Sequence, residues 1–194
     1  MLKAANGEPS RLFLAPDQLT ADSWSPDGRF IFFDQEEPSG KSGIWQLPLE
    51  GDHKPAAILR GDFQLRSARV SPDGRWLVYV SNETGREEVY VQDLPGPGGK
   101  WVISNAGGTE PRWRADGREL FFLAADSTLM SVQVEVAGQA LRASVPHPLF
   151  HTGSAHSYVA SRDGQRFLVA MPLEDDERAS IAVVLNWTQD LRRQ

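Results

Sequence analysis

The chain has 194 residues, a formal net charge of −6 at pH 7 and no cysteine. Its acidic balance argues against a nucleic-acid partner, which needs clustered Lys and Arg, and no stretch approaches the roughly 20 apolar residues of a membrane span. The absence of cysteine excludes disulfides and thiolate nucleophiles and metal sites, while the compartment stays undetermined.

The first pattern along the chain is a repeat. An Asp-Gly pair recurs every 43 to 47 residues and is followed each time by a short apolar run. The four pairs are Asp27-Gly28, Asp73-Gly74, Asp116-Gly117 and Asp163-Gly164. A period in the forties with strand-like segments predicts an all-β fold, a β-propeller of four-stranded antiparallel blades, with about four blades in this chain. The units span approximately 15–61, 62–107, 108–153 and 154–194.

We expect one domain over residues 1–194, either a propeller in itself or the C-terminal part of a larger one. In each unit the Asp-Gly turn joins the inner strand to the second strand, because Gly reaches positive φ without a steric penalty. Third strands are predicted at 43–47, 88–92, 129–134 and 181–185, and outer strands near 56–59, 100–104 and 141–149.

The strand count leaves the two ends of the chain incomplete. The last unit stops at its third strand, whereas residues 9–14 precede the first unit as an orphan outer strand. Two closures remain open. Residues 10–14 complete the last blade within one chain, which is the preferred expectation, or two chains exchange these strands in an eight-bladed homodimer.

Motifs for chemistry are missing from the sequence. It contains no Gly-x-Ser-x-Gly, His-Glu-x-x-His or phosphate-loop motif, so we expect no catalytic residue, no cofactor and no metal. His151 and His156 lack a third ligand at a zinc-site spacing, and the acidic run 174–177 is interpreted as a solvated loop. Trp24 and Trp113 share a repeat position, which predicts that both pack between blades.

Candidate ligand-binding residues lie where outer strands lead into the next inner strand. The connecting loops, near 62–67, 105–110 and 151–157, should gather on one face of a propeller. The charged candidates that enter or approach the central channel are Arg66, Arg69, Glu110, Arg112 and His156. The alternative is that these are solvated charges in local ion pairs.

The Trp-Ser-Pro-Asp-Gly sequence at 24–28, its three variants and the aromatic third strands resemble the TolB-like propeller repeat, a relative of the WD-repeat. About the last 50 residues, through 148–150, 158–169 and 181–187, are similar to the end of propellers fused behind bacterial eukaryotic-like serine/threonine kinases. This resemblance implies a natural C-terminus and further blades upstream. The kinase motifs themselves are missing, so kinase activity is not expected.

The sequence therefore favours a non-enzymatic propeller that binds a protein, peptide or small ligand on one face, in a bacterial signalling protein. The alternatives are the accessory propeller of a prolyl-oligopeptidase-like peptidase and a TolB-type envelope scaffold. The location follows from the parent protein: extracytoplasmic if it carries an upstream membrane helix, otherwise cytoplasmic.

Overall fold

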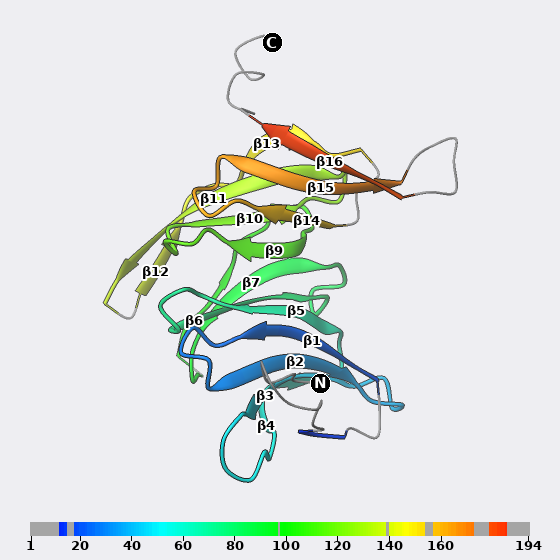
Figure 1. Cartoon of the computed structure of the whole chain (residues 1–194), viewed down its shortest axis with the longest axis vertical. Helices are drawn as coiled ribbons and strands as arrows, with labels where there is room; N and C mark the ends of the chain where they lie inside the picture. Colours follow the sequence, from blue (N-terminus) through cyan, green and yellow to red (C-terminus); the bar gives the residue numbers. More distant parts are fainter. Residues whose placement is uncertain are drawn as a thin grey trace, which may run out of the picture.

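The computed structural model describes residues 12–14, 18–96, 98–138, 140–153, 157–172 and 179–185. They form four antiparallel sheets, which follow one another in chain order from one end of the molecule to the other (Figure 1). The all-β fold of propeller blades is thus confirmed. None of the described residues belongs to a helix long and apolar enough to cross a membrane.

The first two sheets are four-stranded meanders in which each strand pairs with the next. The first contains β1 (Gln18–Trp24), β2 (Phe30–Glu36), β3 (Ser42–Pro48) and β4 (Ala56–Gly61). The second contains β5 (Leu65–Val70), β6 (Trp76–Ser81), β7 (Glu88–Asp93) and β8 (Lys100–Val102). The outer strand expected at 100–104 is therefore shorter than predicted.

The third sheet has five strands, and the fourth has three among the described residues. They are β9 (Thr109–Trp113), β10 (Glu119–Leu123), β11 (Thr128–Ala137), β12 (Ala140–Ala143) and β13 (His147–His151), then β14 (Ser157–Ala160), β15 (Arg166–Pro172) and β16 (Ala179–Leu185). The single outer strand predicted at 141–149 is wrong. Because β11 runs past the end of β10, its far half pairs with β12 and its near half with β13.

The Asp-Gly turns have the predicted backbone. Gly28, Gly74, Gly117 and Gly164 all have φ between +71° and +75°. Each glycine N–H donates to the carbonyl three residues earlier at 2.9 Å. The aspartate Oδ1 accepts from the backbone N–H two residues later, as in the 3.1 Å bond from Arg75 to Asp73. These bonds fix the hairpin between the first two strands of every sheet.

The hydrophobic core lies between neighbouring sheets. Phe32 and Ile44 of the first sheet pack with Leu77, Tyr79 and Tyr90 of the second. The second and third sheets, and the third and fourth, bury similar clusters between them. A sheet is therefore covered on both faces only where it has a neighbour on both sides.

The described sheets do not meet end to end: β1–β4 and β14–β16 lie at opposite ends of the molecule (Figure 1). Residues 12–14, the described part of the expected orphan strand, form no strand. The Phe13 ring lies against Phe33 of β2, with ring centroids 5.9 Å apart. The prediction that these residues complete the last blade is wrong for 12–14, because Leu12 and Phe13 lie on the apolar face of the first sheet, while Leu14 is exposed.

Candidate functional site

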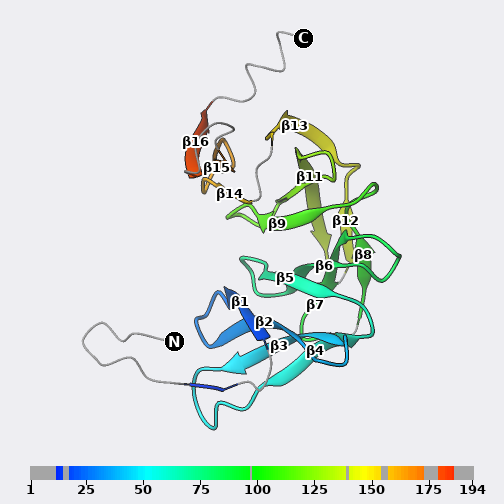
Figure 2. The same cartoon turned by 90° about the vertical axis from the view of Figure 1, so that its right-hand side faces the viewer.

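The innermost strands β1, β5, β9 and β14 run along one side of the stack of sheets (Figure 2). In β1, β5 and β9 the pairing with the second strand shifts at the same repeat position: at Asp22, at Ser67-Ala68 and at Glu110-Pro111. Ser67 and Glu110 have positive φ values of 58° and 52°. A non-glycine residue rarely adopts this conformation, and β-bulges redirect side chains beside functional sites. The inner edge is therefore the part of the backbone that departs most from regular β-structure.

Two carboxyl groups of the first sheet lie at this edge. Burial, and then the charge of Asp34, raise the pKa of Asp22 to about 8, so Asp22 is largely protonated at neutral pH. Burial also raises the pKa of Asp34, which hydrogen-bonds to Asp22. Asp34 Oδ2 accepts a 3.4 Å bond from the backbone N–H of Ser67. The pair thus links the first sheet to the bulge of the second.

Charged groups of the second and third sheets lie next to this pair. Burial, and then the positive charge of Arg112, lower the pKa of Arg69, whose neighbours also include Asp22 and Tyr158. Arg112 Nη2 donates to Glu110 Oε2 at 2.8 Å. Its guanidinium carbon lies 5.8 Å from the centroid of the Tyr158 ring. We call Asp22, Arg69, Glu110, Arg112 and Tyr158 the inner-edge cluster; each of the four sheets contributes at least one member.

Three buried polar atoms of the cluster have no hydrogen-bond partner among the described residues. They are Asp22 Oδ2, Arg69 Nε and the Tyr158 hydroxyl. Burial raises the pKa of Tyr158 well above its usual range, so its hydroxyl keeps its proton. Buried polar groups in proteins are nearly always bonded, so three such atoms in one region mark a place where hydrogen bonds remain to be made.

The structure places the predicted site residues in three ways. Arg69, Glu110 and Arg112 come together in the cluster. Arg66 instead forms an ion pair with Glu87 at 2.6 Å, and it lies with Glu110 on the wall of a cavity of about 500 Å³ between the second and third sheets. His156 lies outside the described residues, as does the acidic run 174–177.

The two tryptophans at the shared repeat position behave differently. Trp113 is partly buried and donates its Nε1–H to the carbonyl of Arg69 at 3.2 Å. Trp24 is 51% exposed, so the prediction that it packs between blades is wrong. The reason is that none of the sheets formed by the described residues precedes the first sheet, so none covers this side chain.

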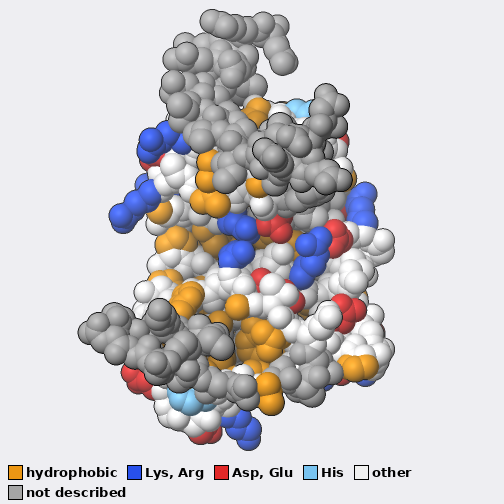
Figure 3. Space-filling view, turned by 45° about the vertical axis from the view of Figure 1, so that its right-hand side comes forward, with side chains coloured by type: hydrophobic (Ala, Val, Ile, Leu, Met, Phe, Trp, Pro, Cys, Tyr) orange, Lys and Arg blue, Asp and Glu red, His pale blue; other side chains and the backbone are white. Residues whose placement is uncertain are grey.

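Sequence reasoning missed Asp22, Asp34 and Tyr158. No catalytic or binding motif contains them, and the position of Asp22 and Tyr158 in the cluster, with Asp34 beside Asp22, depends on bulges that the sequence does not reveal. The available signal was Asp34, an acidic residue that follows four apolar residues in β2, since a carboxylate in such a position is rarely free of a partner. Figure 3 shows acidic and basic side chains gathered across the middle of one face, between apolar areas.

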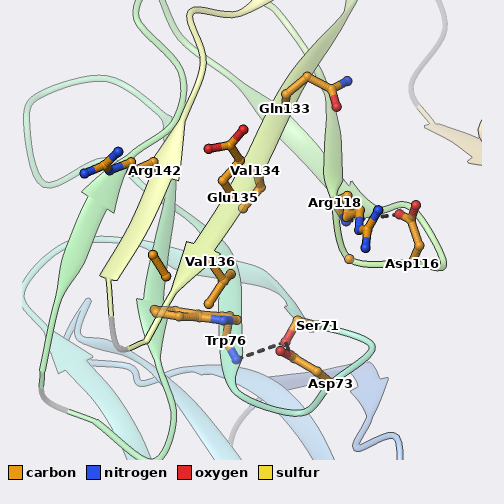
Figure 4. A pocket seen from close by; sticks show the side chains of 12 residues that line it. Ser71, Asp73, Trp76, Asp116, Arg118, Gln133, Val134, Glu135, Val136 and Arg142 are labelled. Carbon is orange, nitrogen blue, oxygen red and sulfur yellow. Dashed lines mark hydrogen bonds between the residues drawn. The ribbon is translucent and has the colours of Figure 1, made fainter.

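A larger cavity, of about 710 Å³, lies between the second and third sheets at the end that carries the Asp-Gly turns (Figure 4). Three of its polar side chains have structural bonds: Ser71 Oγ donates to Asp73 Oδ1 at 2.5 Å and accepts from the Trp76 backbone N–H at 3.0 Å. Asp116 accepts from Arg114. Trp76 Nε1 is the one buried side-chain atom of this lining without a partner among the described residues, compared with three such atoms at the inner edge. The inner edge is therefore the better candidate site.

Comparisons with known proteins agree with this architecture. A 60-residue stretch is 38% identical to the Tol-Pal system protein TolB of Xanthomonas oryzae pv. oryzae (strain PXO99A), covering 29% of this chain and 14% of that protein. The crystal structure of TolB from Acinetobacter baumannii matches with a TM-score of 0.68 and 16% identity, over 92% of this chain and 44% of that one. The putative TolB from Agrobacterium tumefaciens gives 0.70 and 20%, over 90% and 60%.

This chain thus spans about half the length of the two solved TolB chains. The family described as Lipoprotein LpqB beta-propeller domain matches residues 52–189. That match extends over more than half of the chain and includes most of the repeat units described above. The chain therefore belongs to the Lipoprotein LpqB beta-propeller domain family and is a TolB-like β-propeller domain.

Proposed function

We propose that this propeller is a non-enzymatic binding module whose inner-edge cluster recognises a peptide segment of a partner protein. The observation that carries the proposal is the set of three buried polar atoms without partners, contributed by inner strands of three sheets. An unsatisfied buried polar group costs about 1 to 3 kcal/mol. A ligand that bonds to these atoms therefore gains binding energy from groups the fold already holds in place.

The chemistry of the cluster favours a peptide. The Arg69 Nε–H is a donor, whereas the largely protonated Asp22 carboxyl and the Tyr158 hydroxyl can each donate or accept. A peptide backbone presents alternating N–H donors and C=O acceptors, so it matches both kinds of group. The ion pair of Glu110 and Arg112 at the rim, with N···O 2.8 Å, adds a place for polar side chains of the same segment.

Two cellular settings suit such a module. Placement in a bacterial signalling protein, behind a kinase, is supported by the resemblance of about the last 50 residues. A TolB-type envelope scaffold is the second candidate, and the likeness of fold to two TolB structures favours it. In both settings the propeller serves as an interaction surface.

Peptide recognition is tested by panning a phage-displayed library of random peptides against the chain and measuring the affinity of enriched peptides by calorimetry. Arg69→Gln and Glu110→Gln should each weaken binding at least about tenfold, roughly 1.4 kcal/mol. Arg142→Gln, on the outer strand β12, is the matched control and should leave the affinity unchanged. Enriched peptides that bind all three variants equally would exclude the inner edge as the site.

The absence of catalysis needs its own measurement. The purified chain should show only background turnover against panels of peptidase, esterase and phosphotransfer substrates. Turnover that a single substitution in the chain abolishes would show that the protein is an enzyme.

A further inference from the structure

The two end sheets each have one face that no other described sheet covers. We call the face turned toward the preceding sheet the receiving face, and the face turned toward the next sheet the presenting face. On the second strands of the second, third and fourth sheets, receiving-face side chains are all buried: Leu77, Tyr79, Leu120, Phe122, Phe167 and Val169. The corresponding residues of the first sheet are Ile31, which is partly exposed, and Phe33, which is buried. No described sheet lies against them, and Phe33 instead contacts the ring of Phe13.

The receiving face of the first sheet is an apolar groove of about 440 Å³. Trp24, Ile31 and Phe33 line it, and Leu12 and Phe13 form part of its wall. The equivalent of Trp24 in the third sheet, Trp113, is bonded to the backbone of the preceding sheet at the carbonyl of Arg69. Trp24 therefore occupies a position that, in the third sheet, contacts the preceding sheet, but no described sheet lies next to it.

The presenting face of the fourth sheet is open in the same way. At one repeat position Phe32, Val78 and Phe121 are at most 3% exposed, whereas the equivalent Leu168 is 41% exposed. Val159, which occupies the repeat position of Arg69, is 62% exposed. The carbonyl that would accept a bond from a following tryptophan therefore lies at an uncovered edge.

The packing of the Asp-Gly turns is a second, independent indication that the first sheet is uncovered on its receiving face. A Cβ at Gly74 would lie 3.9 Å from Pro26, and one at Gly117 would lie 3.6 Å from Pro72, so each turn packs on the turn of the preceding sheet. A Cβ at Gly28 would meet nothing within 4 Å. Among the described residues, the first turn thus has no turn of a preceding sheet against it.

We propose that a second copy of this chain covers these faces: the presenting face of the fourth sheet of one copy docks on the receiving face of the first sheet of the other. Trp24 Nε1–H then donates to the carbonyl of Val159, as Trp113 donates to that of Arg69. The occupant is a second copy because each molecule carries both halves of the junction that its own repeat uses internally. The peptide-binding proposal is independent of this one.

When two copies are placed head to tail, the receiving face and the presenting face of each copy are both covered. With four sheets in each chain, they form a two-chain ring of eight sheets, which is within the range of known propellers. A head-to-tail contact closes into a ring only when its rotation allows this, and otherwise forms a filament. The homodimer, which the sequence left open as the alternative to closure within one chain, therefore forms through sheet faces and not through strand exchange, with residues 12–14 kept on their own first sheet.

The primary test is the mass in solution, by sedimentation velocity and light scattering over a wide range of concentration. The chain should have twice its monomer mass of 21.5 kDa. Trp24→Glu and Val159→Glu should each give monomers, whereas Val102→Glu, at an exposed valine of β8, should leave the dimer intact. Circular dichroism and denaturation midpoints establish that the variants remain folded. A wild-type monomer at every concentration, or a filament, overturns the two-chain ring.

A mixture of the two monomeric variants tests the head-to-tail arrangement. The Trp24→Glu chain keeps a native fourth sheet, and the Val159→Glu chain keeps a native first sheet. Mixed together, they should form a heterodimer joined by one native junction, although neither associates alone. A mixture that stays monomeric, or a wild-type dimer that neither substitution affects, overturns the proposed junction.

Discussion

At the scale of single residues, the turns show how different side chains supply the same restraint. In the second turn, Ser71 Oγ donates to Asp73 Oδ1 at 2.5 Å. In the third turn arginine replaces the serine, and Arg114 binds both carboxylate oxygens of Asp116 at 2.8 Å. The hydrogen bonds from Arg114 lower the pKa of Asp116 to about 2. The repeat therefore tolerates this substitution because the aspartate remains fixed.

The turn glycine is less replaceable. Gly74 has φ of +75°, so Gly74→Val should lower the free energy of unfolding by about 1 to 3 kcal/mol through backbone strain. Gly74→Asn is the control, because asparagine tolerates this conformation better than a β-branched residue and should lose less. Chemical denaturation measures both changes. Equal losses in the two variants would show that strain at φ is not the cause.

Asp22 predicts a dependence of stability on pH. Burial raises its pKa from 3.8 to about 8 in the folded protein. Between these two pH values Asp22 stays protonated in the folded state but is ionised in the unfolded state. The free energy of unfolding therefore falls as the pH rises from about 4 to about 8. Asp22→Asn removes this titration and should flatten the decline, as followed by denaturation midpoints across the window. Asp62→Asn, an exposed carboxylate, should keep the wild-type slope.

At the scale of elements, the sequence predicted the strands better than their irregularities. The Asp-Gly spacing located the hairpins, and the expected third strands lie within β3, β7, β11 and β16. The grouping of Arg69, Glu110 and Arg112 followed from their place on inner strands. The bulges, the branching of β11 and the contribution of Asp22 did not follow, because they depend on local register and on contacts between sheets that have no short-range sequence signal.

The segment at 12–14 gives a prediction at this scale. The Phe13 ring packs on Phe33 with centroids 5.9 Å apart, but it remains partly exposed. Phe13→Ala should therefore lower the free energy of unfolding by about 1 to 2 kcal/mol, less than for a fully buried phenylalanine. Leu14→Ala, at an exposed side chain, should change it by no more than about 0.5 kcal/mol. Denaturant titration separates the two, and equal effects would contradict the packing role of Phe13.

At the scale of the whole molecule, the described sheets form an open stack with one uncovered face at each end. If two copies cover these faces, folding is coupled to association, and the melting temperature should rise with protein concentration. Val159→Glu should abolish that rise while the chain still folds. Calorimetry at several concentrations gives the answer. A wild-type melting temperature that is independent of concentration would contradict the dimer.

The placement of the core between neighbouring sheets also determines the order in which the sheets of a single chain unfold. In the described part of the chain, each sheet is held by the sheets next to it in sequence, so stability spreads through nearest-neighbour junctions as in a one-dimensional array. The second and third sheets have two such junctions each, and the end sheets have one. Local opening therefore begins at the first and fourth sheets and reaches Trp76, Val78, Leu120 and Phe122 last. The amide protons of β6 and β10 should consequently exchange with solvent more slowly than those of β1 and β14.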